Sequence, residues 1–127
     1  MKQTADALVH VLVVEDETVI GMFIQTELED AGFVVELTET AAQARCKLRD
    51  QRAQFDAAVV DLGLPDDSGE RIIEEVRARH PDMPIVVATG ISKGAMSPLY
   101  ATDANLCLLA KPYQASELVQ SLVTLVH

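Results

Sequence analysis

The chain has 127 residues, 49% of them hydrophobic, and its 20 acidic and 10 basic residues give a formal net charge of −10. This length is typical of one domain, and the apolar fraction is too high for a disordered chain. The charge argues against a nucleic-acid partner, because binding a phosphate backbone requires a basic face. It leaves two interpretations open, a solvated acidic surface that favours solubility or a group of acids that binds a metal ion.

The N-terminus and the cysteines bear on where the protein works. Residues 1–6 are polar and contain no apolar signal region, and no window approaches the roughly 18 apolar residues of a membrane span. Cys46 and Cys107 lie outside any metal-ligand spacing, and their apolar neighbours predict reduced, buried thiols. We therefore expect a cytoplasmic protein without a membrane segment.

The first half of the chain alternates between strand and helix patterns. Residues 8–14 are nearly all apolar, which predicts a strand buried on both faces, as in a parallel sheet. From Thr18 the apolar residues recur with a helical period until Gly32, a common helix stop. Residues 33–37 form a second predicted strand, and Thr40 to Gln43 match a capping box that opens a second helix. The apolar face predicted for the first helix consists of Ile20, Phe23, Ile24, Leu28 and Ala31.

In the second half, an apolar strand over residues 56–61 ends at Asp61 and runs directly into a turn rich in glycine, proline and aspartate. An unpaired carboxylate is costly to bury, so we expect Asp61 at the C-terminal tip of its strand. The segment 92–104 has a partial apolar stripe and contains a glycine and a proline, which predict a short, distorted or mobile helix. The remaining predicted elements are helices over about 70–79 and 116–126 and strands over 84–89 and 106–110.

Strands that alternate with helices imply a parallel sheet covered on both faces, and we expect one three-layer, doubly wound α/β domain over residues 1–127. In such sheets ligands bind outside the carboxyl ends of the strands. Every strand end except the second carries a charged or hydroxyl side chain that faces this edge. These residues are Glu15 and Asp16, Asp61, Thr89, and Lys111.

The residue types at these strand ends suit phosphoryl chemistry. Carboxylates that converge without a partner repel, and Mg²⁺ removes the repulsion with oxygen ligands while it keeps several waters. Asp61 can then attack phosphorus and form an aspartyl phosphate. Mg²⁺ and Lys111 would neutralise the phosphoryl oxygens, and Thr89 would donate a hydrogen bond to one of them. Loss of the phosphoryl group would change these contacts, so the site is also a switch.

Each of these residues also has an ordinary structural interpretation. Asp16 alone fits the N-cap of the first helix, and Asp61 fits a turn residue. Thr89 and Lys111 fit surface polar groups at strand ends. The agreement among the strand ends favours one shared site over separate structural roles.

Four short motifs lie at these strand ends, namely Val13-Val14-Glu15-Asp16-Glu17, Val60-Asp61-Leu62-Gly63-Leu64-Pro65, Ala88-Thr89-Gly90 and Lys111-Pro112-Tyr113. Together they resemble the receiver domain of two-component response regulators, in the family's order and at about its spacings over residues 9–126. The resemblance implies a flavodoxin-like, CheY-like fold, with five helices and a five-stranded sheet of order 2-1-3-4-5.

The resemblance also implies a role for each residue. Asp61 matches the phosphoacceptor, Thr89 matches the switch hydroxyl, and Lys111 matches the family's lysine. The peptide bond between Lys111 and Pro112 is typically cis in the family. The implied Mg²⁺ ligands are Glu15, Asp16, Asp61 and the backbone carbonyl of Gly63.

Two departures from the family pattern concern the route out of the site. Typical receivers carry Tyr or Phe three residues before the lysine, and the aromatic ring turns inward as the threonine moves. Leu108 stands at that position here, so we do not expect the usual coupling between the threonine and an aromatic ring. The second departure is the weak helix pattern over 92–104, which in the family belongs to the output face. Both features resemble an alphaproteobacterial subgroup with a Phe-Ala-Thr-Gly motif, although Val87 replaces its phenylalanine.

The function that the resemblance implies is a response regulator receiver domain. A histidine kinase or histidine phosphotransfer protein would phosphorylate Asp61, and the domain would then signal to a downstream protein by contact, without binding DNA directly or a membrane. It would catalyse only its own phosphorylation and dephosphorylation. Two alternatives remain open, a non-phosphorylated interaction module with the same fold and a receiver excised from a hybrid histidine kinase.

Two enzyme or cofactor classes are disfavoured by motif. Phosphatases with an aspartyl intermediate usually show Asp-x-Asp after the first strand, whereas the acceptor here follows the third strand and has no second acid two residues on. A dinucleotide-binding domain requires a glycine-rich phosphate loop, and residues 14–18 contain no glycine.

Overall fold

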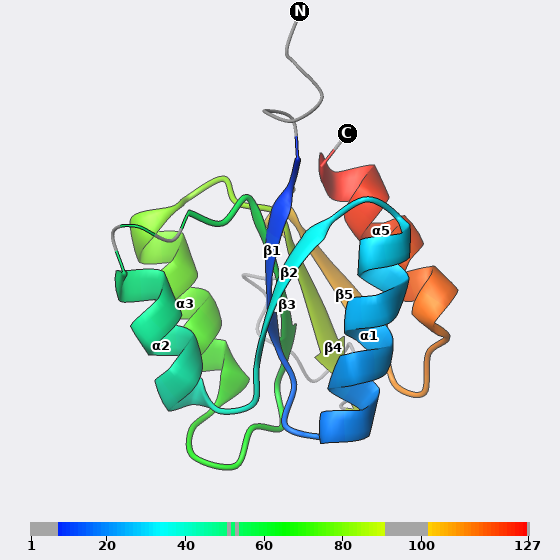
Figure 1. Cartoon of the computed structure of the whole chain (residues 1–127). Helices are drawn as coiled ribbons and strands as arrows, with labels where there is room; N and C mark the ends of the chain where they lie inside the picture. Colours follow the sequence, from blue (N-terminus) through cyan, green and yellow to red (C-terminus); the bar gives the residue numbers. More distant parts are fainter. Residues whose placement is uncertain (1–7, 51, 53, 91–101, 127) are drawn as a thin grey trace, which may run out of the picture.

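The computed structural model describes residues 8–50, 52, 54–90 and 102–126. Its centre is a five-stranded parallel sheet with the strand order β2-β1-β3-β4-β5, which confirms the predicted order (Figure 1). The strands are β1 (His10–Val14), β2 (Val34–Thr38), β3 (Ala57–Asp61), β4 (Ile85–Thr89) and β5 (Leu106–Ala110). The helices in the described part of the chain are α1 (Thr18–Asp30), α2 (Ala41–Arg49), α3 (Gly69–Arg79) and α5 (Ala115–Val126).

The helices form two layers, with α2 and α3 on one face of the sheet and α1 and α5 on the other (Figure 1). Alternate residues of the central strands serve the two layers. Along β3, Ala58 and Val60 join the core beneath α2 and α3, whereas Ala57 and Val59 join the core beneath α1 and α5. This alternation follows from the period of two along a strand, and it explains why the central strands are continuously apolar.

Side-chain caps show why α2 and α3 begin where they do. At α2, the Thr40 side chain accepts a hydrogen bond from the backbone N–H of Gln43 at 3.1 Å. Gln43 Oε1 in turn accepts from the backbone N–H of Glu39 at 2.8 Å, one residue earlier than in a standard capping box. At α3, Ser68 is the N-cap and accepts from the backbone N–H of Glu70 at 3.1 Å. These caps satisfy N–H groups that the first helical turn leaves without partners.

The predicted apolar face of α1 is partly wrong. Ile24 and Leu28 are buried as expected, but Ile20 and Phe23 remain 38% and 58% exposed. The third buried position of α1 is Gly21 instead, and a Cβ placed there would lie 3.0 Å from Leu37 Cδ1. The missing side chain allows α1 to pack closely against β2, and this rotates Ile20 and Phe23 toward solvent.

Two further expectations have different outcomes. Cys46 is exposed on α2 and Cys107 is only partly buried, so the expected burial of both thiols is wrong, and both cysteines are free. The helix predicted over 92–104 falls largely on residues 91–101, which lie outside the described residues. No helix in the described part of the chain combines the length and hydrophobicity needed to cross a bilayer.

Gly69 at the start of α3 gives a testable consequence of this packing. A Cβ at Gly69 would lie 2.5 Å from the carbonyl oxygen of Asp61 and 2.7 Å from Leu62 Cα, both backbone atoms that cannot move independently. We expect Gly69→Ala to lower the free energy of unfolding by about 1–3 kcal/mol, as overpacking does. Gly90→Ala is the control, because a Cβ at Gly90 meets no atom of the described residues within 4 Å. Equal urea midpoints for the two variants would contradict this account.

Candidate functional site

The carboxyl ends of four strands meet at one edge of the sheet. Glu15 follows β1 directly, while Asp61 and Thr89 are the last residues of β3 and β4. Lys111 follows β5, and its backbone N–H donates a hydrogen bond of 2.8 Å to the carbonyl oxygen of Thr89. The parallel sheet therefore collects side chains that lie far apart in the sequence, as the strand-end pattern predicts.

Asp61 lies at the centre of this group. Its side chain is only 3% exposed, with Oδ1 accepting from the backbone N–H of Gly63 at 2.9 Å and Oδ2 accepting from Lys111 Nζ at 2.9 Å. Burial pushes the pKa of Asp61 upward, but the hydrogen bonds from Lys111 and Gly63 outweigh it and leave the pKa below its usual value. Asp61 is therefore an anion at neutral pH, as a nucleophile requires.

Glu15 has the opposite electrostatic character. It is 2% exposed, and burial raises its pKa to about 7, with the nearby charge of Asp61 adding to the increase. The backbone N–H of Glu17 donates to Glu15 Oε2 at 3.1 Å and lowers the pKa, but only in part. Glu15 and Asp61 are therefore two neighbouring buried carboxylates. Ionising Glu15 beside the charged Asp61 is unfavourable unless a further cation binds there.

The three acids fit a divalent cation. Carboxylate oxygens of Glu15, Asp16 and Asp61 lie within 4.8 Å of one another, and Asp16 is the most accessible of the three. Opposite ligands of an octahedral Mg²⁺ ion lie about 4.2 Å apart, twice the metal–oxygen distance of about 2.1 Å. Small side-chain movements would therefore bring all three oxygens to Mg²⁺, and Asp16 would keep the ion open to solvent. Gly63, which the sequence also suggests as a ligand, is exposed and adjoins Asp61 through its N–H.

Lys111 provides the positive charge of the site. Its side chain is 32% exposed, and although partial burial lowers the Lys111 pKa, the hydrogen bond to Asp61 more than compensates and raises the pKa overall. The ammonium group is therefore charged at neutral pH and lies directly against the proposed acceptor oxygen. The peptide bond between Lys111 and Pro112 is cis, as the resemblance to the family implies.

Thr89 and Leu108 occupy the β4–β5 side of the site. Thr89 is buried at the end of β4, where it pairs in register with Ala110. Leu108 pairs with Val87 and packs, partly buried, against the core beneath α2 and α3. Leucine thus fills this position by apolar packing and offers no hydroxyl or ring edge to Thr89.

The N-cap interpretation of Asp16 is wrong. The N-cap of α1 is Glu17, and no side chain caps the helix there. Asp16 therefore does not cap the first helical turn. Its position beside Glu15 and Asp61 fits a role in the shared site instead.

Sequence reasoning missed three residues near the site. The Tyr113 hydroxyl is buried without a hydrogen-bond partner among the described residues, and burial raises the Tyr113 pKa to about 12. Asp66 and Asp67, in the loop after β3, bind α2 rather than the metal cluster. In the sequence, only the run of acids after Pro65 indicated a role for this loop. The partners of Asp66 and Asp67 on α2 lie more than 20 positions away, so the sequence did not indicate these contacts.

Comparisons with known proteins place this arrangement in context. The sequence model of the response regulator receiver domain matches residues 11–123. The acid tolerance regulatory protein ActR of Rhizobium meliloti (strain 1021) is 32% identical over 112 residues, which cover 88% of this chain and 57% of ActR. Sensor kinase CckA of Brucella abortus (strain 2308) is 27% identical over 108 residues, 85% of this chain and 11% of CckA. A CheY-like receiver domain protein of Methanospirillum hungatei JF-1 matches in structure with a TM-score of 0.82 and 25% identity, over 94% of each chain.

The raised pKa of Glu15 predicts an unusual pH dependence of stability in the metal-free domain. A carboxyl that binds its proton more tightly in the folded state stabilises that state below its unfolded pKa of 4.5, and this contribution is lost as the pH rises through about 7. We expect the free energy of unfolding to fall by up to about 3 kcal/mol across this window. The lowered pKa of Asp61 acts only at more acidic pH, below 3.8.

Urea unfolding in a chelator between pH 4.5 and 8 would measure this decline. Glu15→Gln is the matched variant, because it keeps the shape of the side chain but cannot ionise. The variant should show a clearly flatter profile. Parallel profiles for the two proteins would show that Glu15 does not titrate in this range.

Proposed function

The chain belongs to the response regulator receiver family, and we propose that it is a single receiver domain over residues 1–127 that accepts a phosphoryl group on Asp61. The observation that carries the proposal is a buried carboxylate kept anionic by Lys111, whose Nζ lies 2.9 Å from Asp61 Oδ2. In the transfer, one Asp61 oxygen forms a bond to phosphorus. The bond from phosphorus to the donor atom breaks, and the leaving group keeps the electron pair.

The surrounding residues would each stabilise a different part of this reaction. Lys111 is already charged and would bind a phosphoryl oxygen, while Thr89 would donate a hydrogen bond to another. Glu15, Asp16, Asp61 and the carbonyl of Gly63 would hold Mg²⁺, which would supply the positive charge that phosphoryl transfer requires. The raised pKa of Glu15 supports this assignment, because a cation would expel the proton of Glu15 and make both buried acids ligands.

The switch would follow from the same contacts. Lys111 binds Asp61 without a phosphoryl group and would exchange this bond for one to the phosphoryl oxygens. Thr89 would move toward the group, and Leu108, packed against the α2–α3 side of the core, would respond without the hydrogen bonding of a tyrosine. The domain would signal by contact with a downstream protein and catalyse only its own phosphorylation and dephosphorylation.

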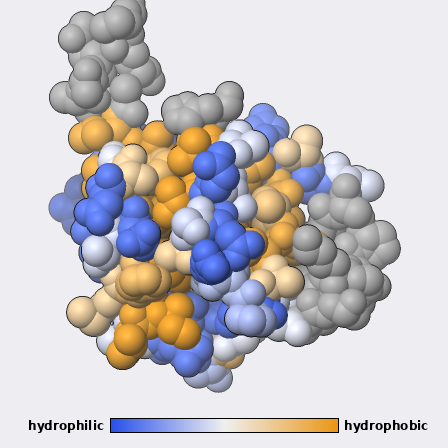
Figure 2. Space-filling model, turned by 90° about the vertical axis from the view of Figure 1, so that its right-hand side faces the viewer, coloured by the Kyte–Doolittle hydropathy of each residue, from blue (hydrophilic) through white to orange (hydrophobic). Residues whose placement is uncertain are grey.

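The phosphodonor we propose is a histidine kinase or histidine phosphotransfer protein that covers an apolar surface beside the site. This α1 patch consists of Val19, Ile20, Met22 and Phe23, which are 80%, 38%, 57% and 58% exposed. It adjoins a cavity of about 430 Å³ lined by Ile20, Phe23, Lys111, Pro112 and Tyr113, among others. Figure 2 shows hydrophobic side chains gathered toward the lower edge of this side of the molecule.

Continuity of the patch with the site supports this choice of partner. Lys111 lines both the cavity and the surroundings of Asp61, so a protein that delivers a phosphoryl group to Asp61 would also contact the α1 patch. Contiguous exposed apolar residues commonly mark an interface of this kind. Such a donor works in the cytoplasm, and two free cysteines suit that reducing compartment.

The alternatives differ in what they ask of the site. A module that only binds other proteins would not need a charged lysine beside a buried anionic carboxylate, so the site favours phosphorylation. A receiver taken from a hybrid kinase would carry the same chemistry, and CckA, described as a sensor kinase, is one of the similar proteins.

The phosphoacceptor is tested by labelling with acetyl phosphate and Mg²⁺. Asp61→Asn should abolish labelling, because an amide lacks the nucleophilic anion. Asp56→Asn is the matched control, since Asp56 precedes the same strand at its other end, where its side chain accepts a hydrogen bond from the backbone N–H of His10. Phosphate incorporation measured by intact mass should persist in that control. Labelling of Asp61→Asn at the unmodified rate would refute the assignment.

The α1 patch is tested by separating donor contact from chemistry. Phe23→Ser should slow phosphoryl transfer about tenfold from any phosphorylated kinase or phosphotransfer protein that labels the unmodified domain, since buried aromatic residues often dominate an interface. Labelling by acetyl phosphate, which has no protein surface, should not change. Val34→Ser is the control, because Val34 is 39% exposed at the opposite end of the sheet. Equal transfer rates for both variants would exclude the α1 patch as the donor surface.

A further inference from the structure

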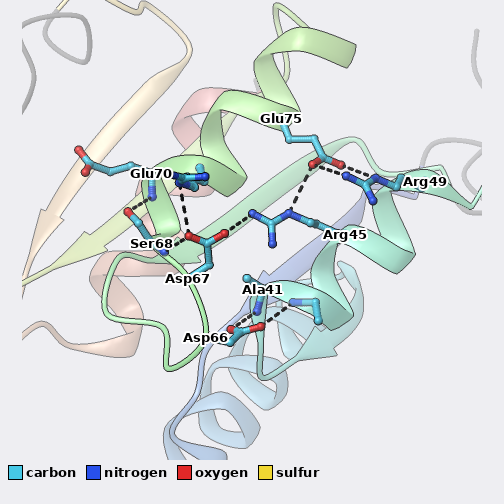
Figure 3. Close-up of polar contacts among 10 residues, drawn as sticks. Ala41, Arg45, Arg49, Asp66, Asp67, Ser68, Glu70 and Glu75 are labelled. Atoms are coloured by element: carbon cyan, nitrogen blue, oxygen red, sulfur yellow. Dashed lines mark hydrogen bonds and ion pairs between the residues drawn. The ribbon is translucent and has the colours of Figure 1, made fainter.

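The loop that leaves the proposed phosphoacceptor is attached to a neighbouring helix. Residues 62–68 connect β3 to α3, and Figure 3 shows Asp66 and Asp67 of this loop directed toward α2. We name these two residues the loop anchor. Neither carboxylate belongs to the metal cluster found among the described residues, which contains only Glu15, Asp16 and Asp61.

Asp66 binds the start of α2. Its Oδ1 accepts from the backbone N–H of Ala41 at 2.8 Å, and its Oδ2 accepts from that of Ala42 at 3.0 Å. The first turn of a helix has N–H groups without intrahelical partners and carries a partial positive charge. Thr40 already caps the N–H of Gln43, so Asp66 satisfies the two preceding groups from outside the helix.

Asp67 binds the side of the same helix. Its Oδ2 lies 2.6 Å from Arg45 Nη2, and both side chains are 25% exposed. Asp67 Oδ1 also accepts from the backbone N–H of Ser68 at 2.7 Å. The Arg45 guanidinium lies 3.6 Å from Glu75 of α3 as well, so α2, α3 and the loop meet at this arginine (Figure 3).

The base of the loop packs directly against Asp61, the proposed phosphoacceptor. The backbone N–H of Gly69 donates to the carbonyl oxygen of Leu62 at 3.3 Å, and Gly69 packs against the backbone of Asp61. Gly63 lies between this base and the loop anchor, and its N–H is bonded to Asp61 Oδ1 at 2.9 Å. The loop is thus fixed at its base by Asp61 and at its tip by α2.

We propose that Asp66 and Asp67 are positioning residues that hold the 62–68 loop so that the Gly63 carbonyl faces the metal position beside Asp61. The inference rests on the Mg²⁺-dependent function proposed above. A loop already ordered before the ion binds loses less conformational entropy on binding. Without the loop anchor, Gly63 would sample other orientations and Mg²⁺ would bind more weakly, although no residue that touches the ion had changed.

Titration calorimetry of the metal-free domain with MgCl₂ tests this proposal. We expect Asp66→Ala and Asp67→Ala each to weaken Mg²⁺ binding severalfold, and the double variant to weaken it about tenfold or more. Asp66→Asn should recover part of the affinity, since its amide oxygen still accepts one bond. The rate of acetyl phosphate labelling in the anchor variants should return to the unmodified value at saturating Mg²⁺, because the reacting groups are intact.

Arg49→Ala is the matched control. Arg49 binds Glu75 through two hydrogen bonds of 3.1 Å and thereby joins α2 to α3, but among the described residues it forms no hydrogen bond or ion pair with the loop. Its removal should leave the Mg²⁺ affinity unchanged at a similar loss of stability. Equal weakening by Arg49→Ala and the anchor variants would overturn the proposal, as would unchanged affinity in all of them.

The design separates failure of this inference from failure of the proposed function. If the unmodified domain neither binds Mg²⁺ nor is labelled by acetyl phosphate, the proposed function itself is wrong. If the unmodified domain does both and the anchor variants bind Mg²⁺ equally well, only the positioning role is wrong. The single variants and Asp66→Asn keep the test available if the double variant does not fold.

Discussion

The ion pair between Asp61 and Lys111 is the interaction on which the rest of the site depends. A carboxylate that is 3% exposed would normally become protonated, yet the 2.9 Å contact with the ammonium group keeps Asp61 anionic. Burial and pairing together produce a carboxylate that is charged but poorly hydrated, as the proposed nucleophile requires. Glu15, equally buried and without such a partner, keeps its proton to about pH 7. The proposed divalent cation would remove this contrast, because it would stabilise the charged forms of both neighbouring acids.

The parallel topology of the sheet brings these two acids together. Parallel strands end at one edge, so a polar residue placed at each strand end reaches the same small region without distorting the core. The surrounding loops then control access and geometry. On one side, the α1 patch exposes apolar residues beside Lys111, where we propose that a protein donor binds. On the other side, Asp66 and Asp67 attach the loop that follows Asp61 to α2, and so the proposed metal position and a surface helix become parts of one unit.

The sequence predicted the strands and the strand-end residues well, because a change from apolar to polar character is a local signal. It failed where the deciding contact is distant. The buried face of α1 depends on Gly21 against Leu37, and a glycine adds nothing to an apolar stripe. The role of Asp66 depends on backbone N–H groups of α2, 25 positions away, which leave no mark on composition or periodicity. Tertiary contacts of this kind are visible only once the chain is folded.

The central claim is that Asp61 carries the phosphoryl group, and chemical trapping tests it most directly. Borohydride reduces an aspartyl phosphate to homoserine, so the domain would be treated with acetyl phosphate and Mg²⁺, reduced, digested and mapped by mass spectrometry. The account predicts homoserine at position 61 and only when Mg²⁺ is present. Homoserine at another carboxylate, or none in a domain that has incorporated phosphate, would contradict it.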